Sequence, residues 1–190
     1  RDCLLSRGLG DVYKRQGYYV DVFRSRKEKG GDKMHDYFYH NLGQTLTLTA
    51  ADGTDLNLQS TEELAFAGAH LYAYSYLYDK KVAATGKDVK ATFTIDMKDK
   101  GGDDISMNLW MKGEPDREVF TALSPMTEGL SRTPGMPYNI KEQPTLTFVA
   151  RQHGEAWNRP FVAVYEPSTR KEPSAIQAVS YFDAEETALF

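Results

Sequence analysis

The dominant pattern along the chain is a series of short strand-like runs, several of them with apolar and polar residues in alternation, that turn residues separate. Thr45 to Thr49 (TLTLT) and Val89 to Met97 (VKATFTIDM) show this pattern most clearly. Because successive side chains of a β-strand point to opposite faces of a sheet, such runs predict half-buried strands. The runs predicted as strands are residues 18–24, 34–40, 45–49, 71–78, 89–97, 105–111, 118–123, 145–151, 161–166 and 175–181. About ten short strands with frequent turn signals predict an all-β fold, an antiparallel β-sandwich.

The connections between these runs carry signals of their own. The charged Gly-Gly segment 26–33 predicts a hairpin between the two runs that flank it. Little helix is expected: a turn or two within 61–69, and a short helix over 183–190. Residues 124–144 contain four prolines and no apolar period, and long loops of this kind inside a domain are usually functional or disordered. We expect either a surface crossover between the sheets or an ordered loop that reaches over a cleft.

Residues 1–16 differ in character from the rest of the chain. Ser6 to Gln16 (SRGLGDVYKRQ) resembles the in-frame translation of a transposon-end sequencing adapter. Segments of foreign origin have to be set aside before a fold is considered. We therefore expect residues 1–16 to be non-native, with a natural basic tail as the alternative. The native chain is then expected to begin near Gly17, to be truncated upstream, and to form one domain over residues 17–190.

Charge and composition exclude several classes of protein. The net charge is −4, and it is more negative without residues 1–16, which carry four basic and two acidic residues. Because phosphate binding needs a basic field, a nucleic acid is not expected as the main partner. An acidic polysaccharide still fits, since a local cluster of Arg, His and Asn can bind a carboxylate.

The single cysteine, Cys3, lies in the excluded segment, so neither a disulfide framework nor a thiolate metal site is expected. No apolar run reaches about 18 residues, so no membrane span is expected.

The densest group of chemically capable residues lies in the run MHDYFYHN. If this run is a strand, alternation places His35, Tyr37 and Tyr39 on one face and Asp36, Phe38 and His40 on the other. A row of His and Tyr side chains could stack on sugar rings and exchange protons, as eliminative cleavage of a uronic acid polymer requires. The alternative for Tyr37 and Tyr39 is structural, because aromatic residues favour strands and bury well there.

Two further aromatic features could bind a glycan. Four tyrosines at every second position, residues 72, 74, 76 and 78, would share one face of a strand. They could form a platform for sugars, although a cross-strand ladder of aromatic rings in the core is the favoured interpretation. Trp157, in the turn-like segment QHGEAWNRP, is a candidate for sugar stacking. The residues predicted to bind substrate are His35, Tyr37, Tyr39, His40 and Trp157.

No catalytic or metal-binding motif is recognisable. His35 and His40 would lie on opposite faces of their strand and should not chelate one ion together. No phosphate-binding glycine loop, nucleophile elbow or zinc-protease motif occurs. We therefore predict no catalytic residue and no metal ligand in this chain.

Three stretches resemble the downstream β-domain of the heparinase II/III-like polysaccharide lyases. In that family a strand of the type "yyvvDvfrv" leads through a Gly-Gly turn to "hdy…h", which Tyr18 to Gly43 resembles. Pro144 to Pro167 resembles the late pair "tLtfvarr…rpFvaVyEP", and Val119 to Pro125 (VFTALSP) resembles the strand before the family's proline-rich loop. The matching positions in the first stretch are Asp21, Gly30, Gly31, His35, Asp36, Tyr37 and His40.

The resemblance implies the carboxy-terminal β-sandwich of a larger enzyme. Such lyases carry an amino-terminal helical toroid and cleave acidic polysaccharides by β-elimination. Their base, acid and carboxylate-neutralising residues, and any divalent metal, belong mainly to parts upstream of Gly17, so this chain is expected to be inactive alone. The resemblance also implies secretion or export to the periplasm. The alternative functions are a non-catalytic carbohydrate-binding or structural sandwich, or an accessory domain of a glycoside hydrolase, since a fold alone does not establish an activity.

Overall fold

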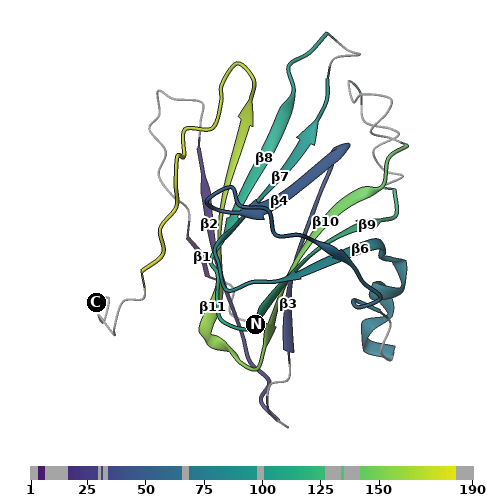
Figure 1. Cartoon of the computed structure of the whole chain (residues 1–190), viewed down its shortest axis with the longest axis vertical. Coiled ribbons are helices and arrows are strands. Elements are labelled where there is room, and N and C mark those ends of the chain that lie inside the picture. Colours follow the sequence, from purple (N-terminus) through teal and green to yellow (C-terminus); the bar gives the residue numbers. More distant parts are fainter. Residues whose placement is uncertain are drawn as a thin grey trace.

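The structure is a computed structural model that describes residues 4–6, 17–29, 31, 34–65, 69–97, 101–126, 134 and 142–182. Two antiparallel sheets pack face to face (Figure 1). The first sheet has the strand order β1 (Leu4–Ser6), β2 (Tyr19–Ser25), β11 (Ala156–Thr169), β8 (Ile105–Met111), β7 (Val89–Ile95) and β4 (Thr45–Ala50). The second has the order β3 (Met34–Asn41), β10 (Thr145–His153), β9 (Arg117–Ser124), β6 (Tyr78–Ala84) and β5 (Gln59–Ser60). The predicted β-sandwich of about ten strands is confirmed.

The core fills the space between the two sheets. Its buried side chains include Phe93, Leu109 and Phe161 from the first sheet and Val119 and Phe148 from the second, each at most 1% exposed. Phe120 belongs to a smaller cluster, with Leu64 and Val149, on the outer face of the second sheet. The second sheet is therefore covered on both faces, which fits the nearly continuous burial along β10.

The predicted hairpin between residues 18–24 and 34–40 is wrong. Both runs are strands, but β2 pairs with β11 in the first sheet, whereas β3 pairs with β10 in the second. Their inward side chains meet across the sandwich instead, with the rings of Phe23 and Tyr37 in edge-to-face contact at 6.1 Å. The pattern predicted both strands correctly, but burial of the apolar face decides which partner each strand takes.

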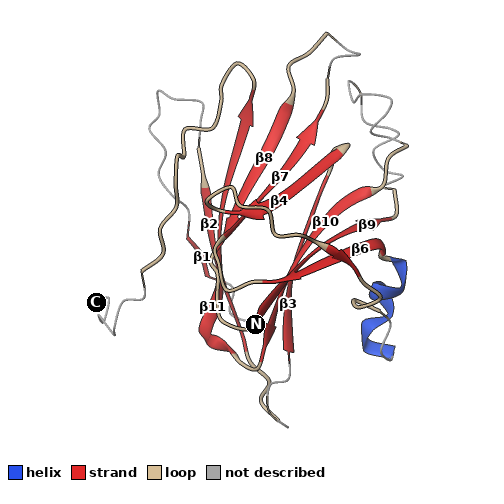
Figure 2. Ribbon diagram, in the orientation of Figure 1, coloured by secondary structure: helices blue, strands red, loops and turns tan. Residues whose placement is uncertain are grey.

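The predicted strand over residues 71–78 is also wrong. Residues Ala69–Tyr76 form the 3-10 helix η1, drawn in blue in Figure 2, and β6 begins only at Tyr78. A 3-10 helix has three residues per turn, so Tyr74 and Leu77 lie on the same side. Both pack on the cluster around Phe120 on the outer face of the second sheet. The strand on which the four tyrosines would share one face, as a platform or a cross-strand ladder, therefore does not form.

Other expectations had mixed outcomes. Residues 175–181 are described without strand, against the prediction, and residues 61–65 form no helix. The predicted helix over 183–190, most of the proline-rich segment 124–144, and residues 1–16 apart from β1 lie outside the described residues. β1 pairs with β2, with Leu4 opposite Val22.

Two glycines allow close approaches between strands. Gly43, in the short connection from β3 to β4, has φ +146°, and an added Cβ would lie 2.5 Å from the carbonyl oxygen of Thr94. Gly113, in the β8–β9 turn, would place a Cβ 2.3 Å from the carbonyl carbon of Lys87. Neither backbone neighbour can move aside easily, so both positions require glycine.

Candidate functional site

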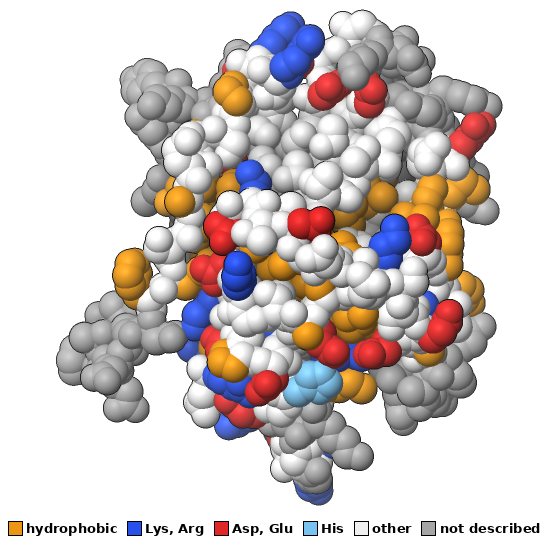
Figure 3. Space-filling view, in the orientation of Figure 1, with side chains coloured by type: hydrophobic (Ala, Val, Ile, Leu, Met, Phe, Trp, Pro, Cys, Tyr) orange, Lys and Arg blue, Asp and Glu red, His pale blue; other side chains and the backbone are white. Residues whose placement is uncertain are grey.

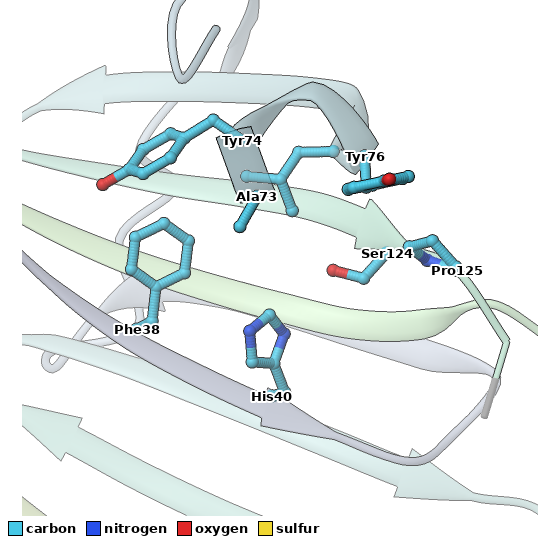
Figure 4. Close-up of a pocket in the computed structure, with 8 residues that line it drawn as sticks. Phe38, His40, Ala73, Tyr74, Tyr76, Ser124 and Pro125 are labelled. Carbon is cyan, nitrogen blue, oxygen red and sulfur yellow. The ribbon is translucent and has the colours of Figure 1, made fainter. Parts of the chain in front are cut away.

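A pocket of about 450 Å³ lies on the outer face of the second sheet, beside η1. Figure 4 shows residues of β3 forming its floor, residues of η1 its roof, and the end of β9 one wall. Hydrophobic side chains gather on this side of the molecule, to the right in Figure 3. The lining residues are Phe38, His40, Ala73, Tyr74, Tyr76, Leu77, Ser124 and Pro125.

The alternation of β3 places the pocket floor. Asp36, Phe38 and His40 point to the outer face, as the sequence predicted, while Tyr37 and Tyr39 point into the sandwich. The rings of Phe38 and His40 are stacked with centroids 5.9 Å apart, and Tyr74 meets Phe38 edge-to-face at 5.2 Å. These contacts form a largely apolar surface with an imidazole at one end.

His40 begins a chain of polar contacts that leads out of the pocket into the sheet. Its Nδ1 lies 2.9 Å from Oγ1 of Thr147, and that hydroxyl lies 2.7 Å from Oγ of Ser124. Partial removal of water from around the ring lowers the pKa of His40 below its usual value, although the residue as a whole is exposed. The imidazole is therefore neutral at neutral pH, with Nε2 directed away from Thr147.

A charged cluster lies directly beneath the roof. Arg151 donates two hydrogen bonds of 2.8 Å to the carboxylate of Asp36, and Glu63 lies 3.5 Å from the same guanidinium. The Tyr74 hydroxyl donates to Oδ2 of Asp36 at 2.6 Å. Burial and the nearby carboxylate raise the pKa of Tyr74, so this hydroxyl is a hydrogen-bond donor rather than a base. The hydrogen bonds from Arg151 and Tyr74 satisfy this carboxylate and fix η1 to the sheet.

Two of the predicted binding residues lie in the core. Tyr37 is 8% exposed and donates a 2.7 Å hydrogen bond to Asp21, with its hydroxyl also in contact with that of Tyr165. The ring of Tyr39 packs on Tyr165 at 4.9 Å and on Phe93 at 5.3 Å. Burial raises the pKa of both Tyr37 and Tyr39. These are the contacts of the structural alternative: Tyr37 is buried, and Tyr39 is partly buried and packs against the core.

The other predicted residues do not meet at one place. His35 and His40 are five residues apart on β3, or about 17 Å along the strand. His35 pairs in register with Gln152, near the turn that leads to Trp157 at the start of β11. Trp157 is partly buried, and the guanidinium of Arg26 lies 4.4 Å from its ring centroid. His35 and Trp157 therefore lie at one end of the sandwich, and His40 lies toward the other.

Sequence reasoning identified His40 but not its surroundings. Tyr74 and Tyr76 were noted as a possible platform, but on a strand that does not exist. Ser124 and Pro125 carry no local signal, because they reach the pocket only through the pairing of β9 with β10. The one available signal was the spacing of Tyr74 and Leu77, which fits a three-residue turn.

Within the described residues, no group of three or more His, Cys, Asp or Glu side chains is arranged to hold a metal ion. No helix in the same part of the chain is long and apolar enough to cross a membrane.

Comparison with known proteins gives one relationship. No family model and no solved structure matches the chain. An endo-acting ulvan lyase from Formosa agariphila is 34% identical over 171 residues, which cover 88% of this chain and 19% of that protein. This chain is homologous to part of a polysaccharide lyase. It spans about a fifth of the length of the curated relative that it matches.

Proposed function

We propose that this chain is the β-sandwich part of a heparinase II/III-like polysaccharide lyase that cleaves a uronic-acid-containing polysaccharide by β-elimination. The observation that carries the proposal is the 34% identity, over 88% of the chain, to an endo-acting ulvan lyase. Ulvan is accordingly the first substrate to test. A catalytic helical toroid in the same protein would be the partner of this sandwich, and secretion or export to the periplasm would bring the enzyme to its substrate.

The described residues supply only part of what elimination requires. The reaction needs a group that neutralises the uronic carboxylate, a base for the C5 proton and an acid for the leaving oxygen. In the pocket, His40 is a neutral imidazole, and the Tyr74 hydroxyl is bound to Asp36 with its pKa raised. No Arg or Lys occurs among the lining residues. The proposed role of this sandwich is therefore to support the catalytic part and to bind substrate, and any divalent metal would be held elsewhere in the protein.

A non-catalytic carbohydrate-binding module is the second candidate. The observation that favours it is the pocket itself, which combines three aromatic rings with one imidazole and has no Arg, Lys, Asp or Glu among its lining residues. The two candidates differ in the activity of the whole protein, because a binding module does not depend on a lyase domain beside it.

The test is to express the full-length protein encoded by the source gene and, separately, this chain. Each is incubated with ulvan, heparan sulfate, alginate and hyaluronan while the ultraviolet absorbance of unsaturated uronyl ends is followed. We expect absorbance to rise with the full-length protein on at least one polymer and not with this chain. If the full-length protein yields no unsaturated product on any of the four, the lyase proposal is wrong, and the binding module becomes the better account.

A further inference from the structure

We propose that the pocket between η1 and β3 binds one uncharged sugar unit, with the sugar ring against the aromatic lining and a sugar hydroxyl hydrogen-bonded to His40. This inference rests on the proposed function, because the unit is taken to be part of the polysaccharide. It assigns the pocket a role distinct from recognition of the uronic acid.

The size and position of the pocket suit a single sugar ring. Its volume of about 450 Å³ lies within the range of about 300–1,000 Å³ that is usual for small-ligand sites. It is also open to solvent, since Ala73, Tyr76 and Pro125 are exposed and Tyr76 is 50% exposed. A unit within a longer chain could therefore enter while its neighbours stay outside.

The lining matches the apolar face of a pyranose. Phe38, Tyr74 and Tyr76 contribute aromatic rings, and Leu77 adds an aliphatic side chain. The C–H bonds on one face of a pyranose carry slight positive charge, whereas the face of an aromatic ring is negative. Contact between the two surfaces removes apolar area from water and is electrostatically favourable.

The charges around the pocket argue against an anionic unit. The lining contains neither Arg nor Lys, and Arg151, beneath Tyr74, already donates two hydrogen bonds to Asp36. A carboxylate or sulfate that entered would lose water without gaining a counter-charge, which is costly. An uncharged unit carries no such cost.

The polar group of the pocket suits a hydroxyl. Nδ1 of His40, which lines the pocket, is engaged with Thr147, so Nε2 is the ring nitrogen left to bind a ligand. Depending on the tautomer, Nε2 of a neutral imidazole either donates or accepts a hydrogen bond. A hydroxyl does both, so it is complementary to His40 in either tautomer, whereas a carboxylate needs the donor form.

The test uses this chain and saturation-transfer and chemical-shift NMR. The uncharged probes are the methyl glycosides of glucose, galactose, xylose and rhamnose, and the matched charged probes are methyl glucuronide and methyl galacturonide. We expect at least one uncharged glycoside to bind with shifts at His40 and Tyr76, and the glycuronides to bind at least about tenfold more weakly, equivalent to about 1.4 kcal/mol.

Three variants locate the binding. Tyr76→Ala and His40→Ala should each weaken binding at least about tenfold, whereas Tyr78→Ala should leave it unchanged. Tyr78 is the matched control because it is 48% exposed, lies at the start of β6 close to the end of η1, and does not line the pocket. Circular dichroism checks that each variant is folded.

The inference is overturned if no uncharged glycoside binds, if the glycuronides bind equally well, or if binding survives both pocket substitutions. These outcomes are separate from those of the lyase assay. Binding without cleavage by the full-length protein would refute the proposed lyase function and leave a carbohydrate-binding pocket. Cleavage without glycoside binding would refute only the role given to the pocket.

Discussion

The hydroxyl of Tyr74 donates a 2.6 Å hydrogen bond to Asp36, and this bond ties the helix η1 to the strand β3. Asp36 and Tyr74 are 38 residues apart in the sequence. The pocket roof thus depends on a carboxylate that Arg151 also holds.

Replacement of Tyr74 by Phe keeps the aromatic ring on Phe38 and removes only the hydroxyl. We expect the Tyr74→Phe variant to lose about 1.5–3 kcal/mol of unfolding free energy, the range for a hydrogen bond to a charged group. Urea denaturation measures the loss. Tyr78→Phe is the control, since Tyr78 is exposed and should change stability by less than about 0.5 kcal/mol. Equal effects of the two substitutions would contradict the anchoring role.

Asp36 and Arg151 should be strongly coupled. Their side chains are only 7% and 9% exposed, and removal of one partner leaves the other charge poorly solvated. We expect Asp36→Asn and Arg151→Met each to lower the unfolding free energy by about 3–5 kcal/mol. The double variant should lose clearly less than the sum of the two single losses. Denaturant unfolding of all four proteins gives the coupling energy. Additive losses would show that the pair acts as two independent residues.

Gly43 and Gly53 form a matched pair of glycines with positive φ, at +146° and +84°. An added Cβ at Gly43 would meet the Thr94 carbonyl, whereas at Gly53 nothing lies within 4 Å. Gly53→Ala should therefore cost only the conformational penalty of about 1–2 kcal/mol. Gly43→Ala should lower the unfolding free energy substantially more, because the added Cβ also clashes with the Thr94 carbonyl. That carbonyl is fixed by a hydrogen bond from the backbone N–H of Gln44. Thermal unfolding of both variants checks the order, and the reverse order would mean that the connection rearranges freely.

His40 should make stability depend on pH in a defined direction. Its pKa in the folded protein is lowered from 6.5 by loss of hydration, so as pH falls the unfolded state takes up the proton first. The neutral His40 ring therefore contributes to the unfolding free energy above the pKa of 6.5 that it has in the unfolded chain. This contribution is lost as pH falls through the lower pKa of the folded protein. The effect should be small, because the ring is partly exposed.

Two measurements test this titration. NMR should show a midpoint below 6.5 for the His40 ring. Replacement by Gln should reduce the fall in unfolding free energy between about pH 7 and pH 5. The difference between wild type and variant isolates His40 from the other histidines. A midpoint at or above the usual histidine value would show that the ring is fully hydrated or paired with an anion.

The local periodicity of the sequence determined where most strands lie and which side chains share a face. The alternation of MHDYFYHN correctly placed Asp36, Phe38 and His40 opposite Tyr37 and Tyr39, because side-chain direction along a strand depends only on its own backbone. The run TLTLT likewise became β4 within one residue of its predicted end.

Only the tertiary structure decided which strands pair and which face is buried. It separated β2 from β3 because Phe23 and Tyr37 pack across the sandwich, and it made η1 from an alternating run because Tyr74 and Leu77 cover the outer face of the second sheet. It also brought His40, Tyr76 and Ser124 around one pocket from three distant segments. Strand pairing and the choice of buried face depend on the apolar surface that is buried between residues far apart in the chain. The local periodicity of the sequence does not predict these long-range contacts.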